Sequence, residues 1–200
     1  MKKIMMMLAL VGLTTLTANA QKIKKIEGNL SPLKGEKALK IEFKYENMEV
    51  GKNLTEEEYI ERKVKEYNEK EAGTGDKWRE SWVRDREARF EPKFIELFNK
   101  YTEKIDLEGA KESASNYTLI VHTYYTEPGF NVGVMRRPAF IHVKYTIVKT
   151  GTNDIVAQYD QQKIPGADAM GYDFDTGTRI AESYAKAGKE FGKLLSKELK

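Results

Sequence analysis

Three strand-like segments in the second half of the chain constrain its fold more than any other feature. Residues 117–126, 139–149 and 154–162 are dense in Ile, Val, Tyr and Thr, the residues that strands prefer. A short turn at 149–153 separates the last two segments, with Gly151 available for a positive φ. These features predict a three-stranded antiparallel meander.

The first half of the chain predicts one strand followed by a helix. Apolar and charged residues alternate cleanly over 37–45, which is the pattern of a half-buried strand. Thr55 and Glu58 have the spacing of a capping box, in which each residue satisfies a backbone N–H of the other. A charged helix is therefore expected from there to about residue 72.

Three further helices are expected. One covers about 76–90 and carries Trp78 and Trp82 one turn apart, which we expect to pack on the sheet. The next has Pro92 in its first turn, where proline is well tolerated. The last runs over about 178–199, with a stripe of small residues that lets a helix lie close to a sheet: Ala181, Ala185, Gly188 and Gly192.

This order of elements predicts an α+β fold. The strand at 37–45 returns through the helices by a right-handed crossover, so that it lies parallel to a later strand. The expected architecture is a two-layer sandwich, in which helices cover one face of a mixed four-stranded sheet. Residues 37–200 form a single domain in this interpretation, and 21–36 form an extended lead-in.

Residues 1–20 have the pattern of a cleavable signal peptide. Lys2 and Lys3 precede an uncharged apolar run over 4–16, and Ala18-Asn19-Ala20 supplies the small residues of a cleavage site. The apolar run is shorter than the roughly 20 residues that a membrane-spanning helix needs. No later stretch is comparably apolar, so we expect export and no transmembrane segment.

The absence of cysteine limits the modes of membrane attachment. Gln21 stands where a bacterial lipoprotein carries its lipidated cysteine, so a lipid anchor is not expected, nor are disulfides. The chain has 34 basic and 31 acidic side chains, and removal of the signal peptide lowers the net charge to +1. So balanced a charge argues against nucleic-acid binding. We expect a periplasmic or secreted protein of a bacterial envelope.

From Tyr117 onward, the chain resembles a loose group of small bacterial envelope proteins of uncharacterised function. The resemblance lies in the segments YTLIVHTYY, FIHVKYTIVKTGTND and IVAQYDQQ, in the Ala-rich final helix and in the strand at 37–45. Many members are lipoproteins, and their fold resembles the N-terminal domain of TolB. The resemblance implies an envelope location. It carries over no catalytic residues.

Two histidines are candidate metal ligands. His122 and His142 lie on consecutive predicted strands, and a symmetric hairpin would bring them opposite each other on one face. Zinc requires three or four protein ligands, and Glu42 is the nearest candidate for a third. No metal or other cofactor is expected, because a polar sheet face explains both histidines without one.

The face that carries the histidines and the loop beside it are the candidate contact surface. Tyr124 and Phe140 share that face, and either a charged helix covers them or they are exposed for binding. The loop 127–138 is long for a hairpin. It offers apolar side chains beside two arginines, which suits docking on a partner: Phe130, Val132, Val134, Met135, Arg136 and Arg137.

The leading hypothesis from the sequence is a non-catalytic envelope protein that binds another protein or an envelope component. The first alternative is a small-ligand or glycan-binding protein in which Trp78, Trp82, Tyr124 and Phe140 stack on the ligand. The second is a metal-assisted hydrolase built on His122 and His142. No hydrolase or nucleotide-binding motif is present, and the sequence leaves the oligomeric state open.

Overall fold

The predicted meander forms the centre of the protein in the computed structural model, which describes residues 22–131, 136–152, 154–166 and 175–200. Strand β9 (Phe140–Lys149) pairs antiparallel with β6 (Tyr117–Glu127) on one side and with β10 (Ile155–Pro165) on the other. Strand β2 (Ala38–Lys44) lies parallel to β6, as the crossover argument predicts. The α+β class and the mixed sheet are therefore confirmed.

The sheet is larger than predicted. It contains eight strands in the described part of the chain, with the order β1-β10-β9-β6-β2-β5 and with β3 and β4 beside that path. The expected number of four strands is wrong because most of the added strands have two or three residues, too few to show alternation. The added strands are β1 (Lys24–Gly28), β3 (Glu49–Val50), β4 (Leu54–Thr55) and β5 (Glu108–Ala110).

Strand β1 comes from the segment predicted as an extended lead-in. It pairs antiparallel with β10 at one edge of the sheet, and all five of its residues are exposed. Its register shifts between Lys25 and Glu27, so Ile26 is the extra residue of a bulge. A short 3₁₀ turn, Ser31–Leu33, then buries Leu33.

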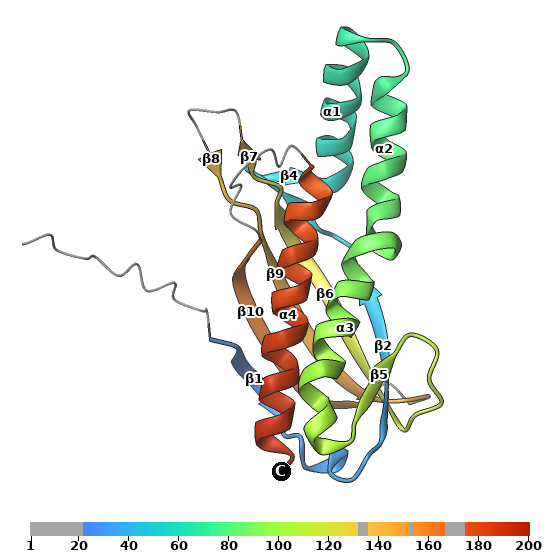
Figure 1. Cartoon of the computed structure of the whole chain (residues 1–200), viewed down its shortest axis with the longest axis vertical. Helices are drawn as coiled ribbons and strands as arrows, with labels where there is room; N and C mark the ends of the chain where they lie inside the picture. Colours follow the sequence, from blue (N-terminus) through green and yellow to red (C-terminus); the bar gives the residue numbers. More distant parts are fainter. Residues whose placement is uncertain (1–21, 132–135, 153, 167–174) are drawn as a thin grey trace, which may run out of the picture.

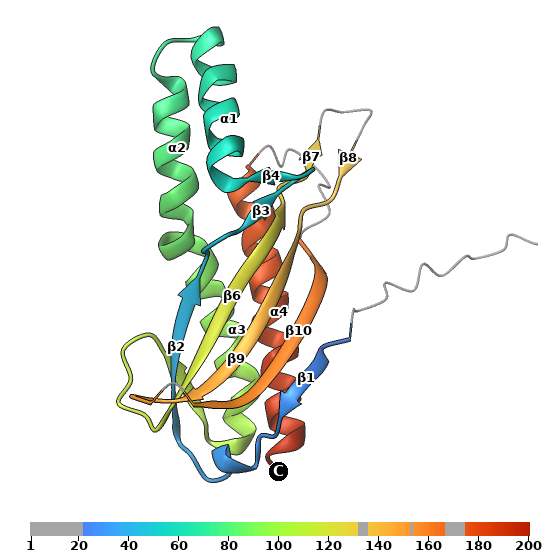
Figure 2. The same ribbon diagram turned by 180° about the vertical axis from the view of Figure 1, so that it is seen from behind.

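Two helices lie side by side on one face of the sheet, whereas the view from behind shows the strands uncovered (Figures 1 and 2). These helices are α3 (Glu91–Thr102) and α4 (Thr176–Glu198). A Cβ atom built at Gly188 would overlap the carbonyl oxygen of Phe94, and one at Gly192 would lie 2.8 Å from that of Phe98. These small residues therefore allow α4 to approach α3, not the sheet as predicted.

The other two helices form a hairpin that projects beyond the end of the sheet (Figure 1). In α1 (Glu56–Lys70) the capping box is confirmed, because Glu58 N donates to Thr55 Oγ1 at 3.2 Å and Thr55 N to Glu58 Oε2 at 2.8 Å. Gly73, at φ 84°, then turns the chain into α2 (Thr74–Asp85).

The tryptophans pack within this hairpin, and their predicted place on the sheet is wrong. The rings of Trp78 and Trp82 stack with centroids 5.5 Å apart, and Tyr59 on α1 lies 5.2 Å from Trp82. Tyr67 stacks on Trp78 at 5.8 Å. Since aromatic pairs at these separations attract one another, the rings form a seam that holds α1 against α2.

A π-helical turn, Arg86–Phe90, joins α2 directly to α3, whose first turn contains Pro92 as predicted. Beside this turn, Glu56 accepts a hydrogen bond from Trp82 Nε1 at 2.7 Å and forms an ion pair with Arg86. The Arg86 guanidinium lies 4.2 Å from the centroid of the Tyr45 ring. These contacts anchor the helical hairpin to the residues that follow β2.

The helix-covered face of the sheet is the core that the alternation predicts. Its side chains are fully buried: Leu119, Val121, Ile141, Val143, Tyr145 and Ile147. Phe191 from α4 stacks on Tyr145 with centroids 4.1 Å apart, and Phe94 from α3 lies beside the same tyrosine at 6.3 Å. The described helices pack on this face only, so the opposite face of the sheet is open (Figure 2).

Candidate binding surface on the open sheet face

Five aromatic side chains form a continuous strip on the open face: His122, Tyr124, Tyr125, Phe140 and His142. Each is half-buried. Tyr125 and His142 stack at 4.6 Å, and Phe140 lies 5.6 Å from both. The predicted contact residues Tyr124 and Phe140 are thus part of one aromatic strip, which no helix of the described chain covers (Figure 2).

A bulge in β6 creates this strip. Thr123 pairs with Val143 and Tyr125 pairs with His142, so Tyr124 is an extra residue between them. An extra residue interrupts the alternation of side chains between the two faces. Thr123 and Thr126 are buried, while Tyr124 and Tyr125 between them are both half-buried and both contact His142.

The register of β6 against β9 contradicts the predicted pairing of the histidines. His122 lies opposite Lys144, and His142 lies opposite Tyr125. The Tyr124 ring contacts both imidazoles, with centroids 6.5 Å from His122 and 5.5 Å from His142. The symmetric hairpin of the prediction would place His122 opposite His142, which is two residues away from its observed partner Lys144.

The groups around the histidines do not form a metal site. His122 Nε2 lies 2.9 Å from the carbonyl oxygen of Glu46, and Glu42 forms an ion pair with Lys40 at 2.7 Å. Within the described ranges, no three His, Asp or Glu side chains converge as metal ligands would.

His142 and Tyr124 have different polar environments within the strip. His142 Nε2 is buried and has no hydrogen-bond partner among the described residues. Burial lowers the pKa of His142 below its ordinary value, so the neutral imidazole is favoured. The Tyr124 hydroxyl donates to Asp160 Oδ1 at 2.9 Å, and burial, followed by this bond, raises the pKa of Tyr124 to about 12.

The hairpin beyond β6 continues the surface. Its strands are β7 (Phe130–Asn131) and β8 (Arg136–Arg137). Phe130 is 38% exposed, and the Arg137 guanidinium lies 5.8 Å from its ring centroid and 3.2 Å from Glu127 Oε2. Val132, Val134 and Met135 lie outside the described residues, as does the side chain of Arg136. Their contact role stays a prediction.

Buried Arg179 ties the base of this hairpin to the start of α4. Its guanidinium donates to the Pro128 carbonyl oxygen at 3.4 Å and to Thr176 Oγ1 at 3.0 Å. Asp175 caps the same helix by accepting a hydrogen bond from Gly177 N at 2.9 Å. No sequence motif marks the contact of Arg179 with Pro128, because the acceptor is a backbone carbonyl 51 residues away.

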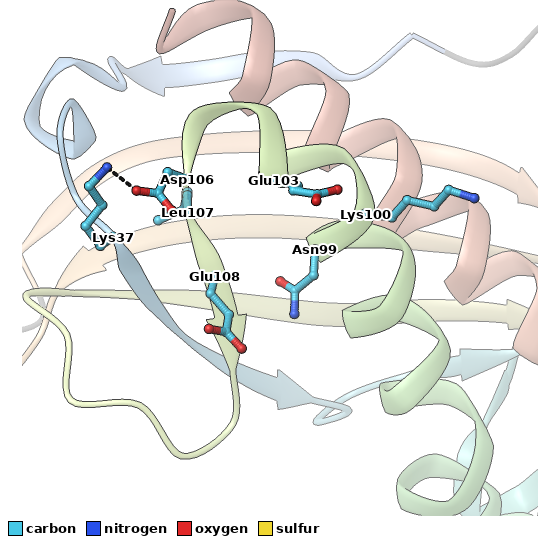
Figure 3. A pocket seen from close by; sticks show the side chains of 7 residues that line it. All are labelled: Lys37, Asn99, Lys100, Glu103, Asp106, Leu107 and Glu108. Carbon is cyan, nitrogen blue, oxygen red and sulfur yellow. Dashed lines mark hydrogen bonds and ion pairs between the residues drawn. The ribbon is translucent and has the colours of Figure 1, made fainter.

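A hollow of about 580 Å³ lies away from this surface, where α3 ends (Figure 3). Its lining is polar, and Lys100 extends away from the Lys37–Asp106 ion pair. The Asn99 side chain is hydrogen-bonded to the backbone of Gly109. Its Nδ2 donates to Gly109 O at 3.0 Å, and its Oδ1 accepts from Gly109 N at 2.8 Å. The Lys37 and Asp106 side chains are 66% and 82% exposed. The contacts of Asn99 fix β5 and suggest no chemistry.

Comparisons with known proteins identify no family. No protein-family model matches the chain, and no curated protein does. Distant matches among solved structures include a PelC dodecamer from Paraburkholderia phytofirmans, at 9% identity and a TM-score of 0.35 over 82% of this chain and 97% of that one. Protein XCC0632 from Xanthomonas campestris, of family-model DUF330, has 11% identity and a TM-score of 0.34 over 86% and 89%.

None of the helices in the described ranges combines the length and the hydrophobicity that a membrane crossing requires.

Proposed function

We propose that this chain is an exported, non-catalytic protein of a bacterial envelope that binds another protein through its open sheet face. The contact surface consists of the aromatic strip and of Phe130 and Arg137 on the adjoining hairpin. One observation carries the proposal: five rings, each in contact with at least one other, lie on the sheet face that no described helix covers.

The properties of the strip suit a protein partner. Contiguous apolar surface that remains accessible on a folded protein commonly marks an interaction site. Aromatic residues and arginine are enriched at the centre of protein interfaces. Because the rings of Tyr125, Phe140 and His142 already stack on one another, they lose little conformational freedom when a partner covers them.

The two alternatives from the sequence have less support. Trp82 is 8% exposed within the helical hairpin, so its ring cannot stack on a sugar in this conformation. A hydrolase built on His122 and His142 needs both imidazoles on one metal, whereas the Tyr124 ring contacts both of them. The signal-peptide pattern and the resemblance to TolB-like envelope proteins support export to the envelope.

Site-specific photocrosslinking in cells that make the protein tests this proposal. A photoreactive phenylalanine analogue replaces Phe140 or Phe130 and, as a matched control, Val83, which is 48% exposed on the helical hairpin. We expect one protein adduct of defined mass from the Phe140 and Phe130 positions and none from the Val83 position.

The adduct from the Phe130 position must also decrease when Tyr125 is changed to Ser, because Tyr125 is part of the same surface. Equal adducts from all three positions, or none from the open face, would contradict the proposal.

A further inference from the structure

Charged side chains form a row across the open face beside the aromatic strip. Lys24 on β1 pairs with Asp160 on β10, Asp160 with Lys144 on β9, and Lys144 with His122 on β6. Directly paired residues point to the same side of a sheet. With strands about 4.8 Å apart, the row is about 14 Å long from β1 to β6.

This row borders a hollow of about 460 Å³, here called the lysine groove. Its lining comes from the four strands of the row: Lys24, Lys25, Ile26, His122, Tyr124, Lys144 and Asp160. A shallow site of this size accommodates a small ligand or a segment of a linear polymer.

The lysines of the groove have no counterion among the described residues. No carboxylate of the described residues lies within 4.0 Å of Lys24, Lys25 or Lys144, although lysines elsewhere pair, as Lys63 does with Glu66 at 2.9 Å. In the part of the chain that the structure describes, Asp160 is the one carboxylate that lines the groove. Lys24 and Lys144 flank Asp160 in the row, so this side of the sheet has a net positive charge in a chain whose total charge is close to neutral, which favours an anionic ligand.

The remaining groups of the groove distinguish among anions. Asp160 Oδ1 accepts the Tyr124 hydroxyl, and its Oδ2 accepts no hydrogen bond from the described residues. A free carboxylate oxygen repels a bare anion, but it accepts hydrogen bonds from hydroxyl groups. The half-buried ring of Tyr124 and the Ile26 side chain, which is 49% exposed, add apolar contact surface.

We infer that the lysine groove binds an acidic saccharide. Lys24 and Lys144 attract its anionic groups, Asp160 accepts hydroxyl hydrogens, and Tyr124 and Ile26 contact the faces of the sugar rings. The groove shares His122 and Tyr124 with the aromatic strip, but Phe130, Phe140 and Tyr125 do not line it, so the two proposals can be tested separately.

Titration calorimetry on protein purified after expression of the full chain tests the inference with three probes. Tetragalacturonate supplies both carboxylates and hydroxyls, maltotetraose supplies hydroxyls alone, and inorganic phosphate supplies charge alone. We expect tetragalacturonate to bind at least about tenfold more tightly than either other probe, and its affinity to fall as salt screens the lysines.

Variants locate the binding on the protein. The double change Lys24→Gln, Lys144→Gln should weaken tetragalacturonate binding about tenfold or more. The matched control Lys37→Gln removes an exposed lysine that is paired with Asp106 at 2.6 Å, and it should leave the affinity unchanged. Asp160→Ala should weaken tetragalacturonate binding but not phosphate binding.

Three outcomes would overturn the inference. They are equal affinity for tetragalacturonate and phosphate, equal affinity for tetragalacturonate and maltotetraose, and equal loss of affinity in the Lys37 control and in the groove variant. Failure to bind tetragalacturonate at millimolar concentration would also overturn it, and it would leave the photocrosslinking result at Phe140 unaffected.

Discussion

The covered and open faces of the sheet both carry stacked aromatic rings, but the rings differ in burial and in hydrogen bonding. On the covered face, Tyr145 and Phe191 stack at 4.1 Å and are fully buried, and the Tyr145 hydroxyl donates to Gln161 Oε1 at 2.8 Å. On the open face, Tyr125 and His142 stack at 4.6 Å and stay half-buried, and His142 Nε2 has no partner among the described residues.

The difference shows that stacking between rings does not by itself bury them. The helices α3 and α4 pack closely against each other and bury the side chains of the covered face. The open face has rings in similar contact but lacks a covering layer. Substitutions of the same kind on the two faces should therefore have unequal effects on stability and on binding.

The largest difference is expected between two phenylalanines. Phe191→Ala removes a fully buried ring and should lower the free energy of unfolding by about 3–5 kcal/mol. Phe140→Ala removes a half-buried ring of the aromatic strip and should lower it by less than about 1.5 kcal/mol. Urea denaturation of both variants measures the difference, and equal losses would show that the open face is also covered.

Gly188→Ala tests the close contact of the helices that complete the covered face. The added methyl group would overlap the Phe94 carbonyl oxygen, so we expect a loss of about 1–3 kcal/mol from overpacking. The control is Gly192→Ala, whose Cβ would lie 2.8 Å from the Phe98 carbonyl oxygen and should cost less. A reversed order of the two melting temperatures would contradict this packing.

Two tyrosine hydroxyls allow a finer comparison. Tyr184→Phe removes a buried hydroxyl 2.7 Å from Thr123 Oγ1 and leaves that oxygen without its partner, which should cost about 1–3 kcal/mol. Tyr124→Phe removes the hydroxyl bound to Asp160 on the open face. Since water can replace that bond, a loss below about 0.5 kcal/mol is expected from the same denaturation measurement.

The smallest expected effect is a pH dependence from His142. Burial lowers its pKa in the folded protein below the ordinary 6.5, so the unfolded chain takes up a proton first as the pH falls. Stability should therefore decrease as the pH falls below 6.5 and stop decreasing, as far as His142 is concerned, below the folded-state pKa. Above 6.5 this contribution disappears.

Urea midpoints of parent and variants between about pH 5 and 8 measure the effect of His142. His142→Phe should remove this component of the pH dependence, whereas His122→Phe should retain it. An unchanged pH profile in His142→Phe would show that another group is responsible.

The elements with long periodic patterns were predictable from sequence, and those set by distant pairing were not. Thr55 and Glu58 are three residues apart, so their capping box is visible in the sequence. Strand β5 has three residues and depends on β2, about 70 residues earlier. Its formation needs the tertiary structure, which no local pattern records.

The candidate surface was predictable only in part, for the same reason. Tyr124 and Phe140 belong to it as expected, but alternation assigns Tyr125 to the covered face. One extra residue in β6 reverses that assignment, and the register before the bulge places His122 opposite Lys144, not His142. The adjacent tyrosines, Tyr124 and Tyr125, interrupt the alternation of β6 and were the one local indication of a bulge.

The number of residues in the π-helical turn at Arg86–Phe90 sets the orientation of the helical hairpin. Each residue of a regular α-helix turns the chain by about 100°. The hydrogen bonds of a π-helical turn span one residue more than those of an α-helical turn. A chain shorter by one residue in this segment would continue as an α-helix but would aim the tryptophan seam in a different direction. Insertions and deletions here, more than substitutions, would therefore re-aim the projecting hairpin while leaving the sheet intact.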